Sequence, residues 1–310
     1  MGGHGETLRL EMHFARDLMT TSTLDNLQVW LSAEARSLCA TLEVHGYERD
    51  PDRLVVDLAD PRGLGSAVRR RGLARGALFH QLVGERPPPE GQRRFGNVLV
   101  RGRGRGTAGR YLGIQFDSNT PLRRSGDQWL WSNSIDASVT AGRVEGLDRA
   151  DWVGRLGLFL AQDPDLVWGA AYMQDEFRAS NLDASSGLRA IGRDARRHLP
   201  GLYWLNYFGE PFTSLMALDS ARATGIGTWT ELDHAVVFEC YGNPEEWPTV
   251  QRKKEQIIDA LGSDLFFDRR DALRQTRAPD FGVTETPTLE PKTFEVFTSD
   301  GSNFTHMPLD

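Results

Sequence analysis

The run Leu202-Tyr203-Trp204-Leu205-Asn206-Tyr207-Phe208 constrains the fold more than any other part of this 310-residue chain. Six of its seven side chains are aromatic or aliphatic, and no charged residue interrupts them. A strand with one face in water alternates apolar and polar residues, whereas a strand covered on both faces is almost continuously apolar. The run therefore predicts a buried central strand.

Other strand and helix patterns alternate irregularly along the chain. Alternation of apolar and polar residues predicts a first strand at residues 8–14. Apolar residues at helical spacing predict helices at residues 24–43, 64–83, 147–162, 211–223 and 249–262. Further strands are expected at residues 52–57, 97–100, 110–116, 128–139, 166–173, 227–233 and 235–241. This order predicts an α+β fold, with a mixed, largely antiparallel sheet, helices packed on it and several hairpins.

The length of the chain allows one large domain or two small ones. We expect a single α+β domain at residues 1–278, with room for two lobes divided near residue 125. An arginine-rich insert at about residues 62–110 interrupts this domain. Residues 279–310 contain four prolines and little periodicity, which indicates an extended or mobile C-terminal tail.

Composition narrows the class of protein. Apolar residues make up 39% of the chain, and no stretch approaches the ~18–20 apolar residues that would span a bilayer. Residues 1–6 lack the basic and apolar regions of a secretion signal. The two cysteines, Cys39 and Cys240, are too few for a disulfide framework or a zinc site. We therefore expect the reducing environment of the cytoplasm.

Positive charge is unevenly distributed. The 36 basic residues comprise 33 arginines and three lysines, and residues 62–124 carry a local charge of +11 although the whole chain carries −7. Within this segment, Arg69, Arg70, Arg71, Arg103 and Arg105 could contact phosphates or an acidic partner. No aromatic residue interleaves with the arginines of residues 101–110, so the composition favours nucleic-acid binding only as an alternative.

Two sequence motifs match those of nucleotide-binding proteins but lack the neighbouring elements or residues that such binding needs. Residues 104–109 match G-x-G-x-x-G, but the alternating residues 110–116 predict a strand where a dinucleotide fold needs a helix. Residues 280–282 read Asp-Phe-Gly, as in protein kinases. A kinase needs a strand lysine that pairs with the phosphates, and no lysine precedes Lys253. Both motifs are interpreted as chance matches in a glycine-rich sequence.

The histidines, Cys240 and the paired carboxylates can be explained without a metal site or a catalytic role. None of the seven histidines lies four residues from another, so no local metal motif is present. His13 shares a strand face with Glu11, where a solvent-facing or hydrogen-bonded histidine is expected. Cys240 lies in an apolar strand, which indicates a buried and inert thiol. Glu231 and Asp233 are expected on one face of a strand, and the pairs Asp175–Glu176 and Glu245–Glu246 in turns or helix starts. All are interpreted as solvated acids, because the sequence does not show environments that would separate their pKa values for acid–base catalysis.

The segment Pro200–Gly209 carries a resemblance to a known family. Its pattern resembles the G-x-x-W-L-(N/T)-x-x-G strand of bacterial immunity proteins of type VI secretion effectors and related polymorphic toxins. The order of elements from about residue 7 to residue 270 is similar to that family as well, whereas residues 62–110 and the tail after 279 depart from it. The resemblance implies a cytoplasmic protein that binds and neutralises a toxin, without enzyme activity, cofactor or metal. Tyr203 and Trp204 are expected in the core.

The leading hypothesis is therefore a non-catalytic immunity protein whose partner is a cognate toxin. Exposed acids and aromatics near strand ends are the candidate contacts, namely Asp175, Glu176, Glu231, Asp233 and Trp247. An acidic surface would attract a basic toxin, and the reverse arrangement, in which the arginines named above meet an acidic toxin, stays open. Two alternatives remain: a nucleic-acid-associated protein that uses residues 62–110, and a hydrolase that uses Glu231 and Asp233 or a distant histidine.

Overall fold

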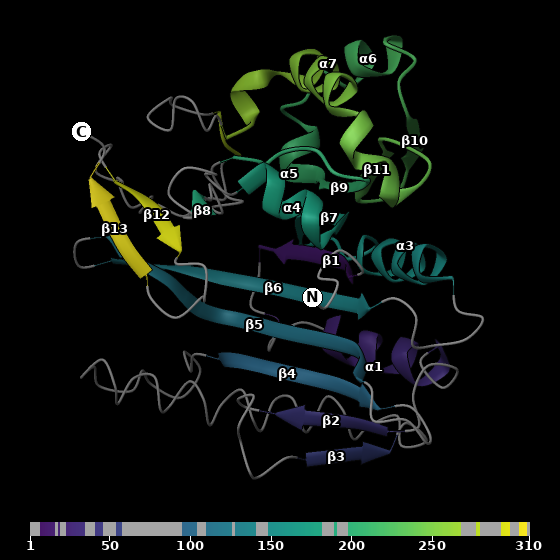
Figure 1. The fold of residues 1–310 in the computed structure, drawn as a ribbon, viewed down its shortest axis with the longest axis vertical. Coiled ribbons are helices and arrows are strands. Elements are labelled where there is room, and N and C mark those ends of the chain that lie inside the picture. The colour runs from purple at the N-terminus through teal and green to yellow at the C-terminus, as the bar shows by residue number, and fades with distance from the viewer. Residues whose placement is uncertain are drawn as a thin grey trace. The chain divides into compact units, whose positions relative to one another are not determined.

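The computed structural model describes residues 7–15, 18, 23–34, 41–45, 54–57, 95–103, 110–125, 128–140, 148–181, 189–190, 198–267, 277–279, 293–297 and 304–308. These residues fall into two compact units, an N-terminal unit (Thr7–Leu156) and a C-terminal unit (Gly157–Asp310). Both contain antiparallel sheets with helices (Figure 1), which confirms the predicted α+β class. Within the described ranges, no helix is both long enough and apolar enough to cross a membrane.

The N-terminal unit is built on a six-stranded antiparallel sheet. Its strand order is β1–β6–β5–β4–β2–β3. The strands are β1 (Thr7–Phe14), β2 (Thr41–His45), β3 (Leu54–Asp57), β4 (Phe95–Arg103), β5 (Arg110–Ser125) and β6 (Gln128–Thr140). The helices of this unit are α1 (Thr23–Glu34) and α3 (Arg149–Leu160), and the boundary between the units lies within α3. The strands predicted at residues 97–100 and 110–116 are confirmed as parts of β4 and β5, which pair with each other.

Alternation along β1 explains how the N-terminal sheet forms its core. Leu8, Leu10, Met12 and Phe14 are buried on one face because successive side chains of a strand point to opposite faces. In the β1–β6 register, Met12 lies opposite Ile135, which is also fully buried. The rings of Trp30 on α1 and Trp152 on α3 are 5.6 Å apart, so the two helices contact each other.

The predicted helix at residues 24–43 is too long. The observed helix ends at Glu34, and Thr41–His45 form strand β2. Strand β2 pairs on one side with β3 and on the other with β4, so both rows of its backbone groups are used in the sheet. Tertiary pairing thus overrides the helical spacing of the leucines, as it often overrides local propensity. The predicted helix at residues 64–83 lies outside the described residues, as do residues 104–109 and 280–282.

The C-terminal unit contains a four-stranded antiparallel sheet with the order β10–β11–β9–β7. Its strands are β7 (Leu166–Met173), β9 (Leu205–Gly209), β10 (Thr228–Glu231) and β11 (Ala235–Glu239). All residues of β9 are buried, and the strand lies between β11 and β7. The prediction of a buried central strand is therefore confirmed, and Tyr203 and Trp204 lie in the core as expected.

Helices and short turns follow these strands. They are α4 (Gln174–Asn181), α5 (Glu210–Thr213), α6 (Leu218–Ala223), η3 (Pro244–Thr249), α7 (Gln251–Leu261) and η4 (Ser263–Leu265). The single helix predicted at residues 211–223 is wrong, because two short helices occupy this range. Thr213 and Ser214 donate side-chain hydrogen bonds to helix carbonyls, and the Ala217 N–H donates to the Leu261 carbonyl of α7. These contacts replace the helical hydrogen bonds that a continuous helix would need.

A second sheet in the C-terminal unit has the order β13–β12–β8. It consists of β8 (Arg189–Ala190), β12 (Thr293–Phe297) and β13 (Phe304–Pro308). The two C-terminal strands form an antiparallel hairpin pair that the sequence analysis did not predict. Their β-branched and aromatic residues favour a strand, although the segments are short and surrounded by prolines.

Candidate functional site

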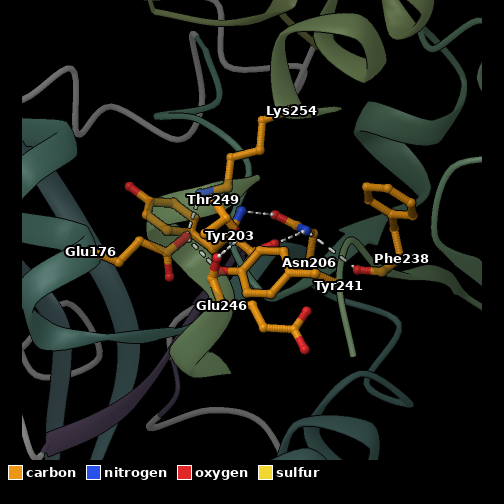
Figure 2. A network of polar contacts seen from close by, with 8 residues as sticks. All are labelled: Glu176, Tyr203, Asn206, Phe238, Tyr241, Glu246, Thr249 and Lys254. Atoms are coloured by element: carbon orange, nitrogen blue, oxygen red, sulfur yellow. Dashed lines mark hydrogen bonds and ion pairs between the residues drawn. The ribbon is translucent and has the colours of Figure 1, made fainter. Parts of the chain in front are cut away.

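A cluster of three buried polar side chains lies in the C-terminal unit. Glu176 lies in the first turn of α4, Tyr241 follows β11, and Lys254 lies on α7 (Figure 2). The Tyr241 hydroxyl donates a hydrogen bond of 2.6 Å to Oε1 of Glu176, and the Lys254 ammonium donates to the same oxygen. We call these three residues the Glu–Tyr–Lys cluster. It joins three segments that lie up to 78 residues apart in the sequence.

The cluster is closed to solvent. The side chain of Glu176 is 0% exposed and that of Lys254 is 5% exposed. The Lys254 nitrogen also lies 5.4 Å from the centre of the Tyr241 ring and 5.8 Å from that of Tyr203, distances at which aromatic faces attract a cation. The ammonium therefore has a carboxylate and two aromatic rings around it in place of water.

Burial dominates the protonation of these groups. It raises the pKa of Glu176, while the charge and hydrogen bond of Lys254, the hydrogen bond of Tyr241 and the Met173 backbone oppose the rise. Burial followed by the charge of Glu176 raises the pKa of Tyr241 far above its ordinary value. Burial also raises the pKa of the Cys240 thiol to about 11. At neutral pH, Tyr241 and Cys240 therefore keep their protons, and the prediction of a buried Cys240 is confirmed.

Asn206 organises the turn that leads into β9 beside this cluster (Figure 2). Its side-chain oxygen accepts from the Tyr203 N–H, and its side-chain nitrogen donates to the Tyr203 carbonyl, both at 2.9 Å. The same nitrogen lies 3.3 Å from the Phe238 carbonyl of β11. Because Asn206 is fully buried, these bonds satisfy an amide that would otherwise be costly to bury. The polar residue of the aromatic run is therefore structural.

The five predicted acidic and aromatic contacts do not form one site. Glu176 was expected to be exposed, but it is buried and paired with Lys254, so this expectation is wrong. Its neighbour Asp175 is partly exposed and forms an ion pair of 3.6 Å with Arg178. Trp247 is half-buried in η3, whereas Glu231 and Asp233 are exposed at the β10–β11 hairpin.

The exposure of Glu231 and Asp233 bears on the hydrolase hypothesis. The side chain of Glu231 is 64% exposed and forms an ion pair with Arg222, and Asp233 lies in the hairpin turn beyond the end of β10. Two carboxyl groups act as an acid–base pair when different environments separate their pKa values. Both carboxyl groups of this pair are exposed, so neither has the enclosed environment that would set it apart from the other. The predicted alignment of Asp233 on the strand face is also wrong.

The five arginines predicted to contact a partner lie outside the described residues or are described by their backbone alone. Arg69, Arg70, Arg71 and Arg105 lie outside the described residues. Arg103 is the last residue of β4, where its backbone pairs with Thr41 and Arg110. These five positions therefore remain predictions from the sequence.

A smaller polar group lies in the N-terminal unit. Nε2 of His13 is 2.7 Å from Oε1 of Glu11, so the prediction of a hydrogen-bonded histidine is confirmed. Both residues face the polar side of β1, and in the β1–β6 register they lie opposite Ser134 and Asp136. The described residues contain no group of three or more histidine, cysteine, aspartate or glutamate side chains suited to a metal.

Sequence reasoning missed Tyr241 and Lys254 as members of a buried cluster. The signal for Lys254 is its position on α7, because Val250, Lys254, Ile257 and Leu261 follow helical spacing on one buried stripe. A lysine within an apolar stripe predicts a buried partner of opposite charge. No pattern in the sequence identifies that partner as Glu176, which lies on another helix.

Comparisons with known proteins give few matches. No family model matches the chain, and no curated protein matches it either. Among solved structures, the chain is similar to the Pseudomonas aeruginosa T6SS protein PA0821, with 14% sequence identity and a TM-score of 0.47. The alignment covers 89% of this chain and 80% of that chain. At this TM-score the similarity assigns neither a family nor a function to the chain.

Proposed function

We propose that this chain is a non-catalytic immunity protein that acts in the bacterial cytoplasm by binding a cognate toxin of a type VI secretion system. The observation that carries the proposal is the division of polar residues in the C-terminal unit. The Glu–Tyr–Lys cluster is enclosed in the core, whereas Glu231 and Asp233 are exposed on a hairpin. Charged groups enclosed in a core are out of reach of a partner, whereas charged groups at an exposed edge are suited to recognising one.

The sequence resemblance supports the same role through the fold. The pattern of residues 200–209 contributes the buried Trp204, the turn-forming Asn206 and Gly209. A Cβ atom at position 209 would overlap the carbonyl oxygen of Leu166, so the close approach of β9 and β7 requires glycine. The resembling residues therefore build the core, and the partner surface lies elsewhere.

The predicted contact residues whose side chains are exposed or partly exposed remain candidates for binding the toxin. Glu231 and Asp233 lie together on the exposed hairpin, and partly exposed Asp175 and Trp247 are additional candidates. Acidic side chains at the rim of an interface accelerate encounter with a basic partner and disfavour partners of like charge. We therefore expect the toxin to present a basic surface to this hairpin.

A growth assay tests the proposed function. The gene product encoded beside this chain is expressed alone and together with it in the same bacterial host. Growth arrest by the neighbour alone, and recovery when this chain is co-expressed, are the expected results. Persistent arrest despite abundant folded chain would overturn the proposal.

Charge-reversal variants locate the contact within the same assay. Glu231→Lys combined with Asp233→Lys should reduce recovery, because both changes place positive charge opposite a basic toxin. Glu255→Lys is the matched control, because Glu255 is an exposed acid on α7 rather than on the hairpin. Equal recovery with the double variant and the control would place the interface away from the hairpin.

A further inference from the structure

Among the residues that the structure describes, strand β10 pairs with another strand on one side only. It is the edge of the β10–β11–β9–β7 order, and its described neighbour is β11. The Leu232 N–H donates to the Ala235 carbonyl at 2.8 Å, which closes the hairpin turn. Hydrogen-bonded and non-bonded pairs alternate along an antiparallel ladder, so Thr230 and Thr228 form the next bonded pairs with β11. The N–H and C=O groups of Trp229 and Glu231 therefore point away from β11.

This edge is held in a fixed position. The Trp229 ring stacks on Phe238 of β11, with ring centres 4.1 Å apart and planes 21° apart. Gly227 precedes the strand with a φ angle of 70°, and a Cβ atom there would overlap Phe238 and the Glu239 carbonyl oxygen. Arg222 of α6 forms an ion pair with Glu231 at the end of the strand. A fixed edge loses little conformational entropy when a partner strand is added.

The charge of the surrounding segment indicates what kind of strand would fit. Residues 223–251 contain five acidic residues and no arginine or lysine, although 33 arginines are present in the whole chain. Two of these acids, Glu231 and Asp233, lie at the exposed hairpin, where Glu231 also forms an ion pair with Arg222, the residue just before this segment. Opposite charges on neighbouring strands stabilise pairing, and like charges oppose it. The edge is therefore suited to a basic strand and disfavours a second copy of itself.

We propose that β10 is a docking edge that captures an extended basic segment of a partner protein as a fifth strand of this sheet. The added strand pairs with the outward N–H and C=O groups of Trp229 and Glu231, and its basic side chains lie near Glu231 and Asp233. This proposal rests on the binding role proposed above and specifies the chemistry of the partner at that surface.

Peptide binding to two variants of Glu231 tests the docking edge. The probe is the capped peptide Arg-Val-Arg-Val-Arg-Val, and binding is followed by chemical shifts of the full-length chain. Glu231→Pro removes the outward N–H and leaves the ladder to β11 intact, because proline is tolerated where an edge N–H faces solvent. Glu231→Gln is the matched control, because it loses the same charge, and with it the ion pair to Arg222, but keeps the N–H. Circular dichroism verifies that both variants fold.

The expected result is saturable binding that shifts the amides of Trp229 and Glu231. Glu231→Pro should weaken binding about tenfold, whereas Glu231→Gln should weaken it only about twofold to threefold. Equal binding of Glu-Val-Glu-Val-Glu-Val, undiminished binding by the proline variant, or no saturable binding would overturn the proposal. A dimer in sedimentation that Glu231→Pro dissociates would also overturn it, with a second copy as the occupant. Peptide binding without toxin neutralisation would support the docking edge and contradict the immunity role. Toxin neutralisation without peptide binding would support the immunity role and contradict the docking edge.

Discussion

At the scale of the residue, two neighbouring lysines on α7 lie in opposite environments. Lys253 is exposed, whereas Lys254 is buried against Glu176, Tyr241 and the ring of Tyr203. A compact ammonium fits this enclosed position, and the larger planar guanidinium of arginine has a different shape and donor geometry. Lys254 is therefore part of the core, whereas Lys253 lies at the surface.

Removing the charge of Lys254 should destabilise the protein strongly. Lys254→Met leaves the Glu176 carboxyl buried without its cation, which costs about 3–5 kcal/mol in the free energy of unfolding. Lys253→Met is the control and should change stability by less than about 0.5 kcal/mol, because Lys253 is exposed. Adding Glu176→Leu to Lys254→Met should recover part of the loss. Urea unfolding measures all three variants, and equal stability of the two single variants would contradict the role of the cluster.

The buried Glu176 should also make stability depend on pH. Its pKa is raised above the ordinary value of 4.5, so the folded protein binds this proton more tightly than the unfolded chain does. The resulting stabilisation is complete below 4.5 and is lost as the pH rises through the folded pKa. Compared with Glu176→Gln, the wild type should therefore lose stability as the pH increases from 4 to 8. A difference that is constant or that grows with pH would contradict the raised pKa.

At the scale of the element, glycines determine how α6 leads into β10. Gly225 and Gly227 have φ angles of 66° and 70°, which favour glycine, and a Cβ atom would be sterically blocked only at Gly227. Gly242 has open space, and its φ lies outside the left-handed range. Gly225→Ala should cost about 1 kcal/mol, Gly227→Ala about 3 kcal/mol and Gly242→Ala almost nothing. Thermal unfolding gives this order, and a Gly242→Ala loss as large as that of Gly227→Ala would contradict it.

Local patterns predicted the elements whose burial follows a simple period. Strand β1 and helix α3 appear close to their predicted ranges, because alternation or helical spacing there matches the buried face. Strand β7 also appears at its predicted range, and all of its residues are buried. Prediction failed where distant contacts decide the conformation. The break between α5 and α6 depends on the Ala217–Leu261 hydrogen bond, and the strand Thr41–His45 depends on pairing with β3 and β4.

The same distinction applies to the candidate site. Glu231 and Asp233 lie at a hairpin, but Asp233 belongs to its turn and not to the strand face that its spacing from Glu231 predicted. Glu176 was misplaced because its burial depends on Lys254, which is 78 residues away. A sequence pattern shows the period of one element, whereas an ion pair between two helices depends on how the chain folds around them.

At the scale of the whole molecule, the sequence contains two segments of opposite charge that could attract a partner. The chain carries −7 overall, residues 62–124 carry +11, and residues 223–251 carry five acids without a basic residue. A basic toxin would be attracted to the acidic segment, and an acidic toxin to the arginines. Salt weakens either attraction, since ions screen exposed charges beyond about 8–10 Å at ordinary ionic strength. Salt dependence alone therefore cannot identify the surface that is used.

Once the toxin has been purified, variants of the two charged segments distinguish binding through the acidic segment from binding through the arginines. The combination Glu231→Gln and Asp233→Asn should slow association about threefold at low salt and flatten its salt dependence, because steering acts mainly on the association rate. The triple variant Arg69→Gln, Arg70→Gln and Arg71→Gln should leave the rate unchanged or raise it, since it removes charge that repels a basic toxin. Stopped-flow measurements from 20 to 500 mM salt, a range of about tenfold or more in ionic strength, give both slopes. Slower association by the arginine variant, with no effect of the acidic pair, would assign the interface to the arginines instead.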